Sequence, residues 1–410
     1  VMSASFMQRG EPAFLDKWSR ARLAVDCGVD LVLELPAAFT LRSAQYFATG
    51  AVQLLAATGC VTHLACGTET PERNYPALAR ALTAPAAQAR LKELLAAGRS
   101  YAVATSELLA ELSGQATYGT PATSPAAPTC AEPATASGLS KGSSMLALPN
   151  DILALEYTKA LLNTTITPVF IKRQDPGYNS TEITATMASA TAIRTAYAAE
   201  ALRSQHAAQA MPNPDTSSED ALSEGSSTSW RDAVPPEVRQ ALETTCAGYD
   251  EARLWQLLRY QLRLLSPEEI ASRCQCSEGL ENLLKQAGNA SSLAEALALC
   301  TKKRYSTSRI RRLLAQLLLN VPRAYLEEEQ PAYLRVLAFN DTGRALLKQM
   351  KTTANLPIIT KLGKDYASLT SSPQLALELK ATDMWSLVQK NSGFDRMGND
   401  FLCSPIYIPK

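Results

Sequence analysis

Apolar and polar positions in the first third of the chain alternate between a helical and a strand period. From Pro12 to Gly28 apolar residues recur at helical spacing, with the proline suited to the first helical position and the glycine to the position after the last. Residues 29–35 then form a short apolar run of the kind that is buried in a parallel sheet. A helix over residues 43–59 and a strand over residues 61–66 repeat the pattern. This alternation predicts an α/β fold with helices packed on a parallel sheet.

Two polar stretches interrupt the pattern. Residues from about 113 to 147 are rich in Ala, Thr, Ser, Pro and Gly and lack hydrophobic periodicity, which indicates a flexible insertion. The pattern resumes with a helix over residues 151–162 and a strand over residues 167–171. The second polar stretch covers residues 203–233, and we place the domain boundary there, so that residues 1–202 form the α/β domain.

Residues 234–410 have a helical pattern throughout, which predicts an all-helical C-terminal domain. Its amphipathic segments cover residues 237–265, 267–286, 291–299 and 306–320. A length of 410 residues suits two or three domains of roughly 100–200 residues each. No apolar run approaches the roughly 18 residues that a membrane helix needs, and no secretory start is present, so we expect a protein of the cytoplasm.

The numbers and positions of cysteines, histidines and charged residues limit which disulfides, metal sites and RNA-binding surfaces the chain can form. Nine cysteines, an odd number without framework spacing, favour reduced thiols. Cys274 and Cys276 lack a second pair, and His63 and His206 lie far from them in sequence, so we expect no metal site. We expect His63 to be a buried histidine in the middle of its strand and His206 to be solvated in a polar linker. Because the formal net charge is only +1, any RNA contact must come from a local basic stripe.

Such a stripe lies at the start of the amphipathic segment over residues 306–320. Its six cations within eleven residues are Lys302, Lys303, Arg304, Arg309, Arg311 and Arg312. The apolar face that follows is formed by Ile310, Leu313, Leu314 and Leu317. Arg309 and Arg312 then project away from that face, as a phosphate-binding surface requires, and a solvated helix end is the alternative.

Residues at the predicted strand ends are the first candidates for ligand binding. Gly67 follows the strand over residues 61–66, at the edge where open α/β sheets bind ligands, although it also suits a turn with positive φ. Asn150 is well placed to cap the helix over residues 151–162. Arg173 follows the next strand, and the alternative for it is a solvated charge at a sheet edge.

Further candidates lie at helix starts. Ser189, Thr191 and Arg194 open a helix, where hydroxyl groups and free backbone N–H groups can hold phosphates. The alternative is an ordinary N-cap followed by an exposed arginine. Lys17 lies on the first helix, beside the loop that contains Arg9, and either cation is a candidate for phosphate or RNA contact, the alternative being the solvated face of the helix.

Several segments together resemble the bacterial tRNA(Met) cytidine acetate ligases, a nucleotidyltransferase-like family. The resemblance is carried by residues 6–12, 16–21, 28–36, 149–157, 189–194, 381–387 and 401–410, and it excludes the two polar stretches. It implies a Rossmann-like nucleotidyltransferase sheet. It also implies an ATP-dependent ligase that forms acetyl adenylate from acetate and ATP, with or without Mg²⁺, and converts the wobble cytidine of elongator tRNA(Met) to N4-acetylcytidine.

The same resemblance implies roles for individual residues. The family's ATP-binding positions match Gly67, Asn150 and Arg173, and its phosphate-binding signature matches residues 189–194. The basic stripe and the helical domain would then hold the tRNA, so that the wobble base can be turned into the active site.

Family members begin with a strand and an Asn-Pro-Phe-His-x-Gly-His loop, whereas this chain opens on Val1-Met2-Ser3. We therefore expect a fragment in which catalysis is impaired or absent. Two alternatives stay open. One is a nucleotidyltransferase acting on a small phosphorylated acceptor, and the other is a non-catalytic fragment that binds tRNA or nucleotide.

Overall fold

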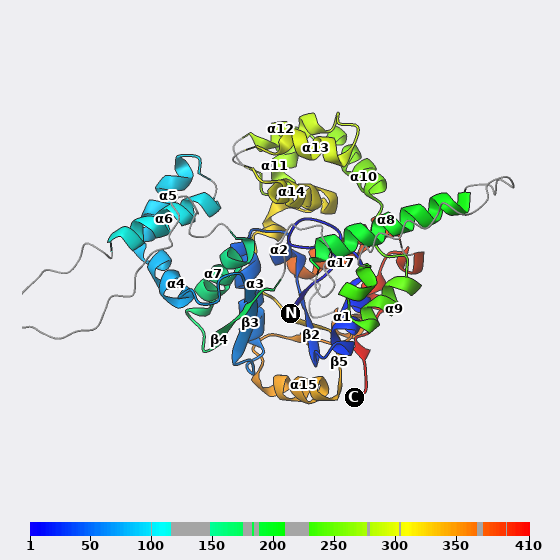
Figure 1. Ribbon diagram of the computed structural model, residues 1–410, viewed down its shortest axis with the longest axis horizontal. Coiled ribbons are helices and arrows are strands. Elements are labelled where there is room, and N and C mark those ends of the chain that lie inside the picture. Colours follow the sequence, from blue (N-terminus) through cyan, green and yellow to red (C-terminus); the bar gives the residue numbers. More distant parts are fainter. Residues whose placement is uncertain are drawn as a thin grey trace, which may run out of the picture. The chain divides into compact units, whose positions relative to one another are not determined.

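The protein was analysed as a computed structural model, which divides into two compact units (Figure 1). The described residues are 1–99, 101–115, 148–174, 183, 188–209, 229–276, 279–302, 305–366, 372–390 and 392–410. Unit 1 contains Val1–Val61, Arg173–Thr301 and Ser306–Lys410, and unit 2 contains Thr62–Lys172 with Lys302–Tyr305. The insertion predicted over residues 113–147 lies almost wholly outside the described residues. No boundary falls at residues 203–233 in this division, because both flanks of that stretch belong to unit 1.

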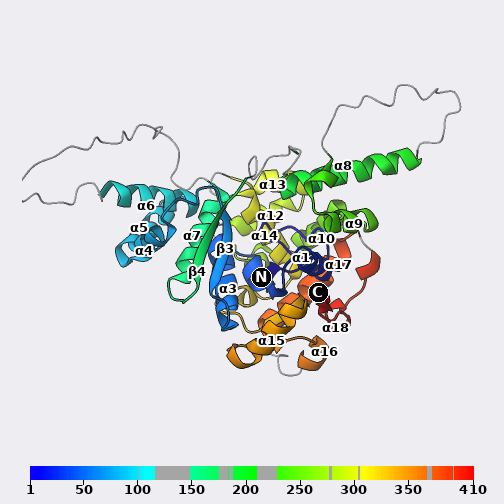
Figure 2. The same cartoon turned by 60° about the horizontal axis from the view of Figure 1, so that its bottom comes forward.

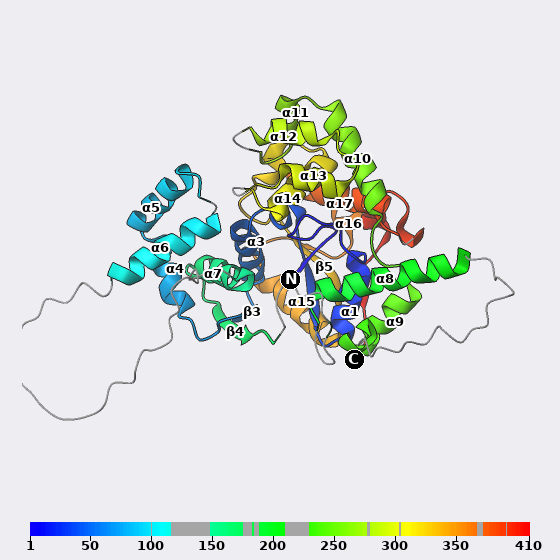
Figure 3. The same cartoon turned by 45° about the horizontal axis from the view of Figure 1, so that its top comes forward.

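The sheet of unit 1 joins strands from the two ends of the chain (Figure 3). Its described strands are β1 (Met2–Ser3), β2 (Leu31–Leu35), β5 (Leu334–Phe339), β6 (Ile358–Ile359) and β7 (Ile406–Tyr407). β1 is parallel to β2, β2 is antiparallel to β5, and β5 is parallel to both β6 and β7. The sheet is therefore mixed rather than purely parallel.

Three strands in residues 334–407 make the prediction of an all-helical C-terminal domain wrong. β5 has the sequence Leu-Arg-Val-Leu-Ala-Phe, and five of its six residues are buried. A short apolar run of this kind fits a buried strand and one face of a helix equally well, so periodicity alone cannot separate the two. The mainly helical region ends before β5.

The first helix begins later than its sequence predicts. α1 (Lys17–Asp26) starts after Asp16, whose carboxylate accepts from the backbone N–H of Ser19, while Pro12 forms a β-bridge with Phe6. Gly28 has φ +111°, as the predicted position after a helix end requires. The inward face of α1 is formed by Trp18, Ala21 and Val25, which pack against β2 and β5.

The other helices of unit 1 cover this sheet or gather beside it. The helices α2 (Ala37–Thr40) and α3 (Ala44–Ala57) follow β2 along the chain. Later helices of this unit are α8 (Ala190–Gln209), α9 (Pro236–Thr244), α15 (Asp341–Thr353), α16 (Leu362–Asp365), α17 (Pro373–Val388) and α18 (Asn399–Leu402). The group drawn from light green to dark yellow in Figure 1 consists of α10 (Glu251–Leu264), α11 (Pro267–Arg273), α12 (Leu280–Ala287), α13 (Leu293–Cys300) and α14 (Thr307–Leu319). Serine side chains cap α11, α13 and α14, which explains why these helices begin where they do.

Unit 2 is built on a parallel pair of strands, β3 (His63–Thr68) and β4 (Thr167–Lys172) (Figure 2). Its helices are α4 (Tyr75–Thr83), α5 (Pro85–Ala96), α6 (Tyr101–Gln115) and α7 (Pro149–Leu161). Tyr75, Leu108 and Leu155 belong to its core, and Cys66 and Phe170 of the strands pack against them.

Both histidines lie where the sequence did not predict them. His63 is the first residue of β3 and is exposed, so the prediction of a buried mid-strand histidine is wrong. Its Nδ1 lies 2.9 Å from the hydroxyl of Thr62. His206 belongs to the helix α8 rather than to a polar linker. Among the described helices, none combines the length and the apolar character that crossing a membrane requires.

Candidate functional site

The carboxylate of Asp151 ties the start of α7 to the turn that follows β3. It is 1% exposed, and Arg73 approaches it to 3.2 Å. Its hydrogen-bond donors are the hydroxyls of Thr68, Thr70 and Tyr75 and the backbone N–H groups of Glu69 and Thr70. Burial acts to raise the pKa of Asp151, but the hydrogen bonds from Thr68, Thr70 and Tyr75 outweigh it and hold the pKa below its usual range. The carboxylate therefore stays ionised and keeps the turn in one conformation.

A second carboxylate makes the reciprocal connection. Glu69 Oε1 accepts from the side-chain Nδ2 of Asn150 at 2.6 Å, and Glu69 Oε2 accepts from the backbone N–H of Asp151 at 2.9 Å. Asn150 is the second residue of α7 and not its N-cap, because Pro149 already occupies the first helical position and Leu148 precedes it. The predicted capping role of Asn150 is thus wrong. In the sequence, these contacts are indicated by an acidic residue directly after one strand and by an Asn-Asp pair at the start of a later helix.

Gly67 lies inside β3, where it pairs with Ile171 of β4 in parallel register. The alternative of a turn with positive φ is wrong, since Gly67 is not among the glycines with positive φ. It is exposed and lacks a side chain, so a ligand can approach the backbone there. Arg173 directly follows β4, is half-buried and already interacts with another part of the protein.

Two arginines meet at the start of α8. Thr191 Oγ1 accepts from Arg9 Nη1 and from Arg194 Nη2, each at 3.3 Å. Ser189 caps the helix, since its Oγ accepts from the backbone N–H of Ala192 at 3.0 Å. Two guanidinium groups beside the positive end of a helix form an electropositive place that suits phosphate oxygens. The structure thus brings together Ser189, Thr191 and Arg194, and it adds Arg9 to them.

Lys17 does not lie at a phosphate-binding surface. Its side chain is 1% exposed, and its Nζ lies 3.0 Å from Glu34, 3.5 Å from Glu378 and 2.7 Å from Asp400. Arg335 is the second cation of this group, 2.7 Å from Asp400. We call these five residues the buried charge cluster. The predicted phosphate or tRNA contact of Lys17 is therefore wrong, because its ammonium group is enclosed by carboxylates.

The buried charge cluster predicts a pH dependence of stability. Burial, followed by repulsion from Glu34, raises the pKa of Glu378 from 4.5 to about 8. Between these values the folded state binds a proton that the unfolded chain has released, so the free energy of unfolding falls as the pH rises. Compared with Glu378→Gln, the unsubstituted chain should lose about 1 kcal/mol or more between roughly pH 5 and pH 8.5. Urea unfolding of both proteins across that range measures the difference, and parallel pH profiles would contradict the assignment.

The loop formed by residues 8–12 packs on α14. Gly10 has φ +80°, and a Cβ atom at this position would lie 2.3 Å from the backbone nitrogen of Arg312, so only glycine fits. Arg311 Nη1 lies 3.1 Å from Glu11 Oε1, and Arg312 Nη1 donates to the carbonyl oxygen of Gln8 at 3.2 Å. These contacts hold the loop at two points.

The same contacts change the picture of the basic stripe. Arg312 is half-buried and donates to the carbonyl oxygen of Gln8, so the prediction that Arg312 projects away from the protein is wrong. Burial, and then Arg309, lower the pKa of Arg312 to about 10. Ile310, Leu313, Leu314 and Leu317 are all buried, as predicted. Lys302 is exposed and Arg309 is half-buried, while Lys303 and Arg304 lie outside the described residues.

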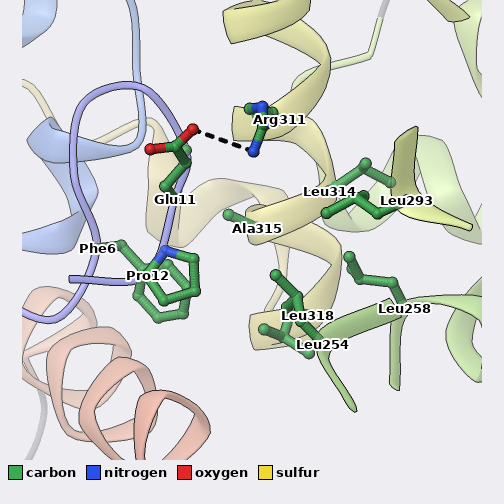
Figure 4. Close-up of a pocket in the computed structure, with 11 residues that line it drawn as sticks. Phe6, Glu11, Pro12, Leu254, Leu258, Leu293, Arg311, Leu314, Ala315 and Leu318 are labelled. Carbon is green, nitrogen blue, oxygen red and sulfur yellow. Dashed lines mark ion pairs between the residues drawn. The ribbon is translucent and has the colours of Figure 1, made fainter. Parts of the chain in front are cut away.

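A small apolar pocket lies between this loop and the helices α10, α13 and α14 (Figure 4). It is narrow and partly open to solvent, and the ion pair between Glu11 and Arg311 lies at one side of it. Its apolar lining includes Phe6, Pro12, Leu258, Leu293, Leu314 and Leu318. No grouping of three or more potential metal ligands occurs within the described ranges.

Comparisons with known proteins show which family the chain belongs to. The family model described as HIGH Nucleotidyl Transferase matches residues 1–400, which defines the class of protein. The tRNA(Met) cytidine acetate ligase of Alkaliphilus metalliredigens is 32% identical over 429 residues, covering 99% of this chain and 91% of the relative. The protein of the same name from Clostridium kluyveri is 35% identical over 421 residues, covering 100% of this chain and 91% of the relative.

Solved structures give the same result. The crystal structure of Thermotoga maritima TmcAL in its apo form has a TM-score of 0.80 at 26% identity, over 100% of this chain and 92% of the other. TmcAL bound with alpha-thio ATP has a TM-score of 0.78 at 27% identity, over 100% and 91% of the two chains. The chain belongs to the tRNA(Met) cytidine acetate ligase family of the HIGH nucleotidyl transferases.

Proposed function

We propose that the chain is a ligase that acetylates the wobble cytidine of elongator tRNA(Met), with ATP and acetate as co-substrates. The observation that carries this proposal is the similarity to named ligases over 99% and 100% of the chain, which includes the residues of both units. The structure of a relative bound with alpha-thio ATP supports ATP as the nucleotide. A tRNA substrate also fits the location in the cytoplasm that the sequence predicts.

Two groups of residues serve the nucleotide in this proposal. Gly67, Asn150 and Arg173 contact ATP, in keeping with the glycine backbone that is open to a ligand and the asparagine held by Glu69. Ser189, Thr191 and Arg194, joined by Arg9, hold the phosphates, in keeping with the two guanidinium groups at the start of α8.

The chemistry has two steps. An oxygen of acetate attacks the α-phosphorus of ATP, a P–O bond forms, and pyrophosphate leaves. The N4 amine of cytidine then attacks the acetyl carbonyl of the adenylate, AMP leaves, and the amine loses a proton. Arginines beside the phosphates favour the first step, because they stabilise the charge that passes to the departing pyrophosphate.

RNA contact in this proposal involves the part of the basic stripe that does not hold the loop of residues 8–12. Lys302 and Arg309, with Lys303 and Arg304 from the sequence prediction, meet the phosphate backbone. Arg311 and Arg312 serve instead to hold the loop of residues 8–12. The wobble base must be unstacked to reach the adenylate, which requires the anticodon arm to be held.

The test is the formation of N4-acetylcytidine on an elongator tRNA(Met) transcript with ATP and labelled acetate. Label in the tRNA, dependent on ATP, supports the proposal. The assay is run on this chain and on a version that also carries the family's Asn-Pro-Phe-His-x-Gly-His loop. If neither protein transfers label, the ligase proposal fails. Transfer of a nucleotide to a small phosphorylated acceptor would then favour the first alternative.

A further inference from the structure

The side-chain amide of Asn150 is engaged by the protein at one end only. Asn150 is 8% exposed, and its Nδ2 donates to Glu69 Oε1 at 2.6 Å. Its Oδ1 accepts no hydrogen bond from the part of the chain that the structure describes. This oxygen is not one of the enclosed polar atoms that lack a partner, so it is open to solvent and can accept a hydrogen bond from a ligand that donates one.

Glu69 determines which end of the amide faces the ligand. A carboxylate can only accept hydrogen bonds, so the nitrogen of the Asn150 amide has to face Glu69. The other oxygen of Glu69 is occupied by the backbone N–H of Asp151 at 2.9 Å. Glu69 is itself fixed, because its backbone N–H donates to Asp151 Oδ1 at 3.0 Å. The amide is therefore held in one orientation with its oxygen turned from Glu69.

We propose that Glu69 is a positioning residue that presents Asn150 Oδ1 to ATP as a hydrogen-bond acceptor. It thereby selects a nucleotide that donates at this place, through the 6-amino group of the base or through a ribose hydroxyl. Glu69 acts through Asn150 and does not itself contact the nucleotide. The inference rests on the proposed function, in which Asn150 contacts ATP.

The substitution Glu69→Gln separates positioning from a general structural role. The backbone N–H of Asp151 still requires an acceptor, so the oxygen of the introduced amide should take that place and its nitrogen should face Asn150. Asn150 must then turn its own amide, which points Nδ2 instead of Oδ1 toward the ligand. The shape of the site is kept while an acceptor becomes a donor. Glu72→Gln is the matched control, because Glu72 is an exposed residue of the same turn.

The experiment measures binding of ATP, inosine triphosphate and 2′-deoxy-ATP by calorimetry to the full chain and both variants. We expect E69Q to lose about 10- to 100-fold in ATP affinity, with its melting temperature and the affinity of E72Q unchanged. If the 6-amino group is the donor, E69Q should also lose the preference for ATP over inosine triphosphate. If the 2′-hydroxyl is the donor, E69Q should lose the preference for ATP over 2′-deoxy-ATP instead.

A double-mutant cycle guards against an effect on folding. In an Asn150→Ala background, E69Q should change ATP affinity by less than about twofold, because the group that Glu69 orients is gone. Equal ATP affinity of E69Q and the unsubstituted chain would overturn the inference alone. The inference would also be overturned if E69Q lowered the affinity for all three nucleotides equally and did so in the Asn150→Ala background as well. Absence of ATP binding by the unsubstituted chain would overturn the proposed function as well.

Discussion

Lys17→Met is expected to lower the free energy of unfolding by about 3–5 kcal/mol, the largest effect on stability that we predict. The substitution leaves Glu34, Glu378 and Asp400 buried with Arg335 as the one remaining cation of the cluster. Methionine fills a similar volume, so the loss arises from uncompensated buried charge rather than from a cavity.

Urea unfolding followed by circular dichroism measures this change at neutral pH. Lys348→Met on the exposed side of α15 is the control and should fall within about 0.5 kcal/mol of the unsubstituted chain. Equal losses for the two variants would show that the buried charge cluster is not held by its lysine.

Arg194→Ala is expected to weaken ATP binding and acetyl adenylate formation by about 100-fold, the largest effect on activity that we predict. The guanidinium group of Arg194 lies at the start of α8 together with that of Arg9, and it supplies charge where the proposal places phosphate oxygens. Calorimetry with ATP and a pyrophosphate-exchange assay with acetate measure the two quantities.

Arg203→Ala on the exposed part of α8 is the matched control and should bind ATP like the unsubstituted chain. If Arg194→Ala behaves like this control, the phosphates do not bind at the start of α8. Unaltered melting temperatures of both variants are needed for the comparison, since α8 also contributes to the core through Tyr197.

Local pattern predicts those parts of the fold that depend on neighbours in sequence. The inward face of α1, the strands β2 and β4 and the buried face of α14 follow from the spacing of apolar residues over a few turns or pleats. The sequence also predicts the family, ATP as the nucleotide and the α/β class, because short segments with a characteristic order of residues are enough to indicate them.

Features that depend on distant partners do not follow from local pattern. The pattern predicts helix where β5 lies, because the partner strand β2 is far away in sequence. It predicts a surface charge at Lys17, although Glu34 within an apolar strand is a sequence sign of a buried counter-charge. It predicts Arg312 at the surface, because nothing local reveals that the loop containing Gly10 would cover it.

The pairing of β2 with β5 has a consequence for synthesis on the ribosome. β2 is completed early, but its antiparallel partner emerges only after roughly 300 further residues, which takes roughly 15–60 s at the usual rates of translation. During that time a strand whose last four residues are buried in the folded protein has one edge without its final partner. The nascent chain is thus exposed to aggregation for most of its synthesis, and folding of unit 1 is essentially post-translational.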